Sequence, residues 1–129
     1  MNRLDEILQQ AKLLSFDLNF TKAKDWKFKE PSRVLVGYLP IYFPREVVHA
    51  MNGLAVGIMG AGDHKQIIKG DAYYQSYICH LPRGIIEMAL DHSLENFDGF
   101  IFPAICDCIR NLSGMFKLAK KGNFQRYFD

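Results

Sequence analysis

The chain has 129 residues, of which 49% are hydrophobic and 23% are charged, and its formal net charge at pH 7 is +2. This length and composition predict a single globular unit, because such a chain buries roughly two-thirds of its unfolded surface. The small net charge argues against a nucleic-acid-binding protein, and no apolar run approaches the roughly 18 residues of a membrane span.

The start of the chain and its cysteines indicate the compartment. The first residues carry neither the basic start nor the apolar segment of a secretory signal peptide. The three cysteines are an odd number, which points to reduced thiols or metal ligands rather than to a disulfide framework. We therefore expect a cytoplasmic protein whose cysteines stay reduced.

Residues 1–33 are expected to form an N-terminal segment that precedes the main domain. Apolar side chains recur at helical spacing over residues 4–14, with charged and amide side chains between them, which predicts an amphipathic helix. Residues 20–33 lose that pattern and carry four lysines. They predict a basic surface connection with room for one short helix, which we favour over a phosphate-binding segment.

A Rossmann-like α/β domain is expected over residues 34–129. The continuous apolar run at 34–39 predicts a strand that is buried on both faces and ends at Pro40. Pro44 can open a helix in its first turn, and this helix is expected to end near residues 52–53. The half-buried stripe expected on that helix consists of Val47, Val48, Met51 and Leu54.

A second strand is predicted at residues 55–59, and the glycine-rich turn at 60–63 closes it. The later elements are helices over about 71–78 and 82–91, a strand over 99–104, a helix from Cys106 to about Lys117, and a strand over 124–128. The last helix would bury Ile109, Leu112, Phe116 and Ala119. Strands that alternate with helices imply right-handed parallel crossovers. The predicted fold class is therefore α/β, an open doubly wound, mostly parallel sheet flanked by helices, Rossmann- or flavodoxin-like.

The carboxyl ends of the strands are the expected place for a ligand site, because open α/β sheets bind ligands beyond those ends. Loops leave predicted carboxyl ends at residues 40–44, 60–63 and 103–107, and they should converge on one crevice. The glycines of the segment 57–62 stand in the wrong order for a dinucleotide-binding loop, so a tight turn is favoured there.

Two cysteines stand in distinctive settings. Cys79 precedes a Pro-Arg helix start, and Cys106 follows an apolar run at a strand-to-helix junction. Thiolates are the ligands of iron–sulfur clusters, and helix N-termini favour an anionic thiolate. The spacing leaves a ligand role and a buried structural thiol equally open for Cys106, and for Cys79 it favours the structural role.

Cys108 is expected to be a core thiol. It lies two residues after Cys106, about 200° around a helix, so both thiols cannot face one ion once the helix has begun. It also shares helical spacing with Leu112 and Met115.

Other chemistry has less support in the sequence. A zinc site would have to use Cys79, His80, Cys106 and Cys108, but adjacent residues do not easily chelate one metal ion. The tyrosines fit half-buried packing positions better than a pocket for an aromatic substrate: Tyr73, Tyr74 and Tyr77. The sequence contains no Ser-His-Asp set and no P-loop, so catalysis by side chains alone is not expected.

Three segments together resemble the benzoyl-CoA reductase and 2-hydroxyacyl-CoA dehydratase family. They are GYLPIYFPRE at 37–46, GDAYYQSYIC at 70–79 and FPAICDCIRNLSGM at 102–115. The resemblance covers nearly the whole chain and is strongest to the smaller cluster-carrying subunit of the ATP-dependent benzoyl-CoA reductases.

The resemblance implies an iron–sulfur site. Cys79 and Cys106 match the family's first two ligands of a [4Fe-4S] cluster, whereas Cys108 matches none. A third protein ligand lies further downstream in the family, in a second Rossmann-like domain outside this chain. The chain is therefore expected to be the N-terminal part of a longer subunit, and to be inactive by itself.

The resemblance also implies a function. The subunit would pass low-potential electrons through the cluster to the aromatic ring of benzoyl-CoA, in anaerobic aromatic degradation. The implied partners are an acyl-CoA, a sister subunit of the same family and an ATP-hydrolysing iron–sulfur activator, without nucleic acid or membrane. Arg45, Glu46, Gly60 and Gly62 would lie near the acyl-CoA. The alternatives are a 2-hydroxyacyl-CoA dehydratase subunit and a non-catalytic assembly or CoA-binding domain.

Overall fold

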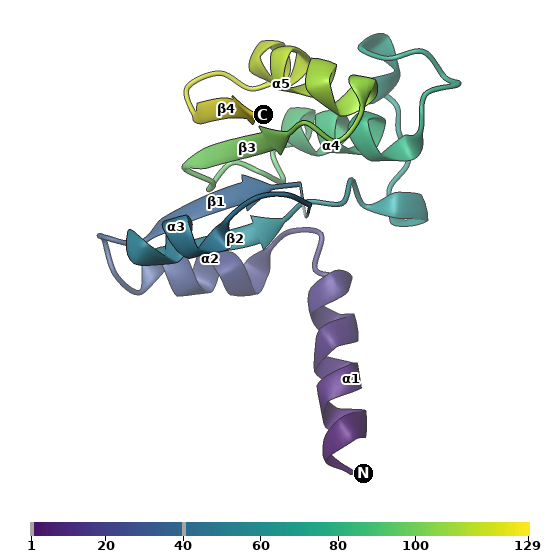
Figure 1. The fold of residues 1–129 in the computed structure, drawn as a ribbon. Coiled ribbons are helices and arrows are strands. Elements are labelled where there is room, and N and C mark those ends of the chain that lie inside the picture. The colour runs from purple at the N-terminus through teal and green to yellow at the C-terminus, as the bar shows by residue number, and fades with distance from the viewer. Residues whose placement is uncertain (1, 40) are drawn as a thin grey trace.

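The computed structural model of the chain describes residues 2–39 and 41–129, so the predicted strand end at Pro40 lies outside the described residues. Figure 1 shows how the helices and strands are arranged. In chain order they are α1 (Arg3–Ser15), α2 (Thr21–Phe28), β1 (Val34–Tyr38), α3 (Arg45–Ala50), β2 (Gly53–Gly57), the 3-10 turns η1 (Gly62–His64) and η2 (Gly70–Ala72), α4 (His80–Leu90), β3 (Gly99–Pro103), α5 (Asp107–Ala119) and β4 (Phe124–Phe128).

The four strands form one parallel sheet in the order β2-β1-β3-β4. All four arrows point the same way in Figure 1. The strand order reverses between β1 and β3, which is the switch point where doubly wound sheets bind ligands. The predicted α/β fold with a parallel sheet and an N-terminal helix is confirmed.

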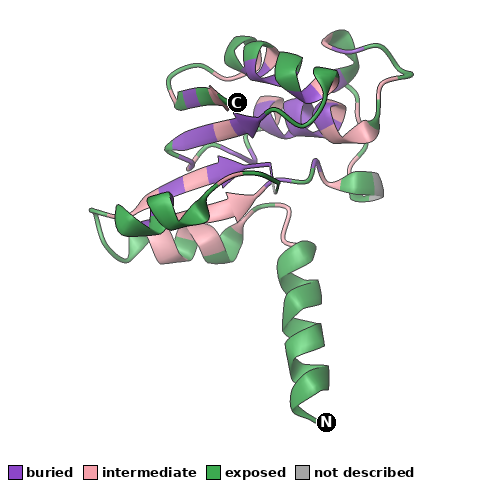
Figure 2. Cartoon of the chain, viewed as in Figure 1, coloured by how far each residue is buried: buried purple, intermediate pink, exposed green. Residues whose placement is uncertain are grey.

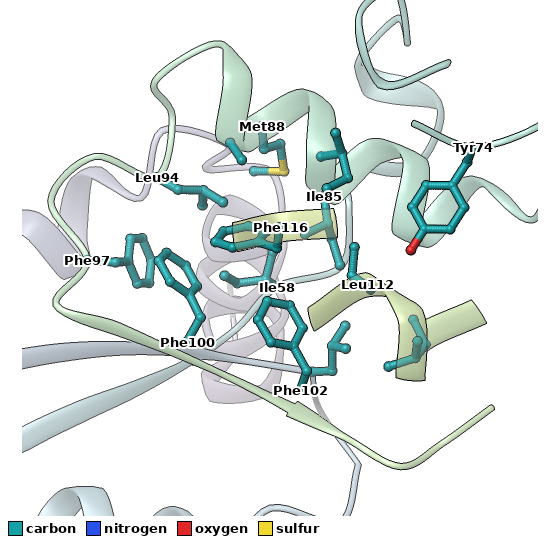
Figure 3. Close-up of a cluster of buried hydrophobic side chains, with 14 of the residues drawn as sticks. Ile58, Tyr74, Ile85, Met88, Leu94, Phe97, Phe100, Phe102, Leu112 and Phe116 are labelled. Atoms are coloured by element: carbon teal, nitrogen blue, oxygen red, sulfur yellow. The ribbon is translucent and has the colours of Figure 1, made fainter. Parts of the chain in front are cut away.

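Aromatic side chains fill the core on the face of the sheet that α4 and α5 cover. Phe116 of α5 packs against Phe100 and Phe102 of β3, with ring centroids 4.7 and 5.1 Å apart. Phe97 stacks on Phe100 at 5.3 Å. Figure 3 shows these rings beside Met88 of α4. Because burial of one such side chain contributes about 1.5–3 kcal/mol, this cluster holds both helices on the sheet.

The basic stretch after α1 contains the short helix for which the sequence left room. This helix, α2, packs against β1 and β2, and Phe20 just before it meets the ring of Phe97 edge-on at 5.1 Å. Lys24 donates to the carbonyl of Ser93 at 3.2 Å, and Lys27 forms a 2.7 Å ion pair with Asp98. Two of the four lysines therefore tie α2 to the loop before β3.

The predicted amphipathic helix is present as α1, but its apolar stripe is not buried. A capping box begins it, in which Asn2 and Asp5 exchange hydrogen bonds of 3.2 and 2.9 Å. Leu4, Ile7 and Leu8 are each more than half exposed. Figures 1 and 2 show α1 projecting from the body of the molecule with exposed residues on all sides.

Two predicted boundaries were wrong around α3. The helix ends at Ala50, so Leu54 belongs to β2, and Val48 is the buried member of the predicted stripe. Strand β2 begins two residues earlier than predicted, at Gly53. A side chain at Gly53 would collide with Val48 and Val34, so the glycine lets β2 start directly under α3.

The helix predicted over residues 71–78 was also wrong. Only the 3-10 turn η2 forms there, followed by turns that lead to Cys79. The buried carboxylate of Glu87 in α4 accepts hydrogen bonds from the amides of Ile68 (3.0 Å) and Gly70 (2.7 Å). These two contacts fix the start of the segment against α4.

Candidate functional site

Cys79 and Cys106 occupy equivalent places at the carboxyl edge of the sheet. Cys79 is the N-cap residue of α4, Cys106 is the N-cap residue of α5, and both are exposed. Neither side chain makes a capping hydrogen bond. The first amides of a helix have no intrahelical acceptor, so both thiols stand beside backbone donors that favour an anionic ligand.

The prediction that Cys108 is a core thiol was wrong. Cys106 has an extended backbone (φ −156°, ψ 171°), so α5 begins only at Asp107 and the predicted separation of 200° does not apply. Asp107 is the first helical residue. The Cys108 side chain is half-buried and does not belong to the core cluster. Partial burial, together with the neighbouring thiols of Cys106 and Cys79, raises the pKa of Cys108.

Tyr74 connects the segment before Cys79 to the first turn of α5. Its hydroxyl donates a 3.2 Å hydrogen bond to the carbonyl of Cys108, and the side chain is buried. Burial and the nearby thiols raise the pKa of Tyr74 to about 12, so the hydroxyl remains a donor at neutral pH. Figure 3 places Tyr74 at the margin of the aromatic core. The tyrosine spacing indicated packing, and no sequence signal indicated this hydrogen bond.

The predicted substrate-contacting residues lie at the start of α3, which follows β1, and in the turn after β2. Arg45 and Glu46 are the first two residues of α3, and both are exposed. Gly60 and Gly62 follow β2 with left-handed φ values of +68° and +52°. Gly60 is buried against the backbone of α4, whereas Gly62 is exposed.

The single crevice expected from the sequence is divided into separate cavities. Gly62 lines a mostly apolar cavity of about 580 Å³ between the end of α1, β2 and the turn after it, together with Met59 and Met88. Cys106 lines a smaller cavity of about 200 Å³ with Arg110 and Tyr127. The larger cavity is therefore not the one beside the thiols.

The predicted metal ligands form only part of a site. Within residues 2–39 and 41–129, no group of three or more His, Cys, Asp or Glu side chains is arranged to hold a metal ion. The four-ligand zinc site considered from the sequence is thus not assembled. Cys79 and Cys106 can offer two exposed thiolates, which fits part of the donor set of an iron–sulfur cluster.

Among the helices that the structure describes, none is long and apolar enough to cross a membrane.

Comparison with protein families matches residues 40–124 to the family model described as 2-hydroxyglutaryl-CoA dehydratase, D-component (HGD-D). The match includes both exposed N-cap cysteines and the strands β2 and β3.

Several curated proteins are similar to this chain. It is 51% identical over 124 residues to a subunit of the benzoyl-CoA reductase of Thauera aromatica, which covers 96% of this chain and 32% of that protein. It is 36% identical over 95 residues to the beta subunit of (R)-2-hydroxyglutaryl-CoA dehydratase from Acidaminococcus fermentans, which covers 74% of this chain and 25% of that protein. It is 33% identical over 117 residues to the beta subunit of lactoyl-CoA dehydratase from Anaerotignum propionicum, which covers 91% of this chain and 30% of that protein. The chain thus spans about a third or less of the length of these relatives.

Proposed function

Because the chain belongs to the 2-hydroxyglutaryl-CoA dehydratase D-component family, as its resemblance implied, we propose that it is the N-terminal part of a benzoyl-CoA reductase subunit. In this proposal residues 34–129 form the first α/β domain of a longer, cytoplasmic subunit, and residues 1–33 precede it. The whole subunit acts in an enzyme complex, in the anaerobic degradation of aromatic compounds.

One observation carries the assignment of the site. Cys79 and Cys106 are the N-cap residues of two helices that start at the same edge of the sheet, with exposed thiols that make no capping hydrogen bond. We assign them as two ligands of a [4Fe-4S] cluster, with a third protein ligand outside this chain.

The residues of this chain would hold and tune the site. A bound cluster supplies one-electron chemistry at low potential, here from an ATP-hydrolysing iron–sulfur activator toward the ring of benzoyl-CoA. The first-turn amides of α4 and α5 favour the negative charge of the thiolates, and buried Tyr74 fixes the turn that carries Cys106 and Cys108.

We assign the acyl-CoA to the loops after β1 and β2. Arg45 is exposed at the start of α3, where its guanidinium can meet a phosphate group, and Glu46 lies beside it. Gly62 lines the 580 Å³ cavity, and Gly60 gives the same turn its left-handed backbone. Benzoyl-CoA is favoured as substrate because identity is higher to the reductase subunit (51%) than to the dehydratase subunits (36% and 33%).

A second candidate is a subunit of a 2-hydroxyacyl-CoA dehydratase. It is supported by the family match and by the two dehydratase subunits among the relatives. Either candidate requires a sister subunit, since the relatives are named as subunits.

The test measures iron and acid-labile sulfide in the full-length subunit, purified without oxygen together with its sister subunit. The expected result is about four of each per subunit. Cys79→Ser and Cys106→Ser should lose most of both, whereas the control Cys108→Ser should keep them. Wild-type cluster content in both ligand variants would refute the assignment and leave an assembly or CoA-binding role.

The substrate is tested with the same complex, its activator, ATP and a low-potential reductant. Loss of benzoyl-CoA with formation of a cyclic diene supports the reductase. Dehydration of a 2-hydroxyacyl-CoA without ring reduction supports the dehydratase instead.

A further inference from the structure

We propose that Arg83 is a positioning residue for Cys79, which sets where the Cys79 thiol stands relative to Cys106. The inference rests on the proposed function only because it takes Cys79 as a cluster ligand. That Arg83 positions the Cys79 thiol is argued from the contacts of Arg83 alone.

Arg83 lies in the first turns of α4 and reaches back over the segment that precedes the helix. Its Nε and Nη2 atoms donate to Oδ1 of Asp71 at 2.8 and 2.6 Å. Its Nη1 atom donates to the carbonyl oxygens of Ser76 at 3.2 Å and Ile78 at 3.4 Å. The guanidinium is thus shared between one carboxylate and two carbonyls of the same segment, and its side chain is only 16% exposed.

The carbonyl of Ile78 belongs to the peptide that leads directly into Cys79. Holding this oxygen fixes the plane of that peptide, and therefore the direction in which the Cys79 side chain leaves the backbone. Within the segment Tyr74 is buried and Ile78 is half-buried against the core, whereas Tyr77 is 81% exposed, and the turn has a 3.0 Å hydrogen bond from the Ile78 amide to the Gln75 carbonyl. Arg83 is the side chain of α4 that holds the two carbonyls next to Cys79.

The anchor of Arg83 is itself fixed. Asp71 follows Gly70 in η2, and the Gly70 amide donates to the buried carboxylate of Glu87 at 2.7 Å. A Cβ at Gly70 would stand 2.5 Å from the carbonyl oxygen of Arg83, so η2 lies tightly against α4. From the same segment Tyr74 reaches α5. One set of contacts thus joins the helix that starts at Cys79 to the helix that starts at Cys106.

The geometry requires arginine rather than a positive charge alone. A guanidinium is planar and carries five donors in a fixed fork, whereas a lysine ammonium is a point charge on a flexible stem. Lysine at position 83 could pair with Asp71, but it could not hold the carboxylate and both carbonyls together. Arg83→Lys keeps the positive charge but removes the planar set of donors, and Arg83→Gln removes the charge as well.

The experiment measures the distance between spin labels on Cys79 and Cys106 in the 129-residue chain, with Cys108→Ser present throughout. The expected result is a narrow distance distribution with Arg83 and a broadened one with either Arg83→Lys or Arg83→Gln. Arg33→Gln is the matched control. Arg33 is 23% exposed, pairs with Glu30 and donates to the Trp26 carbonyl at 2.8 Å, but it precedes the amino end of β1, opposite the thiols.

An unchanged distribution in Arg83→Lys would overturn the proposal, even if Arg83→Gln failed to fold. Broadening in Arg33→Gln as large as in the Arg83 variants would also overturn it, since that would reflect general loosening. Iron affinity of the full-length subunit provides a second measurement, and both Arg83 variants should lose about ten- to a hundredfold. If the wild-type subunit binds no iron, the proposed function fails while the label distances still decide the role of Arg83.

Discussion

Gly84 in α4 lies directly against the carbonyl oxygen of Gly60, in the turn that follows β2. A Cβ at position 84 would overlap that oxygen. The contact lets the first turns of α4 pack onto the end of the sheet. It therefore fixes how close the start of α4, with Cys79, lies to the sheet. Gly60 also has φ +68°, which a residue without a side chain adopts without strain.

Alanine at position 84 should therefore destabilise the chain by about 1–3 kcal/mol, because the backbone of α4 or of the turn must move. The matched control is Gly114→Ala in α5, where a new Cβ meets no atom within 4 Å. Alanine there should stabilise the chain by about 0.5–1 kcal/mol through helix propensity. Urea unfolding of both variants measures the difference, and changes of the same sign would contradict the packing described here.

Glu87 is the second structural support of the segment before Cys79. Glu87→Ala should destabilise the chain by about 1–3 kcal/mol, because the buried Gly70 amide loses its acceptor. Glu87→Gln retains an acceptor oxygen and should lose less. Hydrogen exchange reports the effect locally, since the amides of Ile68 and Gly70 should exchange faster in the alanine variant. Unchanged protection of both amides would show that another group holds them.

The parts of the fold that sequence predicted are those governed by local patterns. Residues 124–128 form β4 with the predicted bounds, and the apolar run at 34–39 gives β1 with one residue fewer. The failed helix over 71–78 has the opposite cause. Glu87, 17 positions away from Gly70, holds the start of this segment against α4, and no local pattern shows this contact.

The residues of the candidate site also fall into those that the sequence identified and those that it missed. Motif resemblance selected Cys79 and Cys106, and the structure places both at helix N-termini on the carboxyl edge. The supporting side chains Tyr74 and Arg83 were missed, because their partners are backbone carbonyls that any residue type supplies. Cys108 was misplaced because its predicted direction depended on whether α5 begins before or after Cys106.

Asp91, which follows α4, should give the chain an acid-dependent stability. Burial alone would raise the pKa of Asp91, but hydrogen bonds from Lys65 and Ser93 outweigh it and hold that pKa below its ordinary value of 3.8. A carboxyl with a lower pKa in the folded state stabilises the fold above its unfolded pKa. This contribution is lost as pH falls through the folded pKa.

The measurement for Asp91 is the free energy of unfolding between about pH 6 and pH 2. Asp91→Asn should be less stable than wild type near pH 6, and the two should converge at the acid end. Lys65→Met removes the charged partner named above and should reduce the same slope. Parallel curves for wild type and Asp91→Asn would show that this carboxyl does not contribute.

Helix α1 should add little to the stability of the rest of the chain. Leu8 is 51% exposed, and none of the residues of α1 that the structure describes is buried, whereas Leu112 in α5 is fully buried. Leu8→Ala should therefore change the free energy of unfolding by less than about 0.5 kcal/mol, and Leu112→Ala should cost about 2–5 kcal/mol. Urea unfolding of the 129-residue chain tests both. A cost for Leu8→Ala near that of Leu112→Ala would mean that α1 packs on the sheet in solution, which the exposure of its apolar stripe argues against.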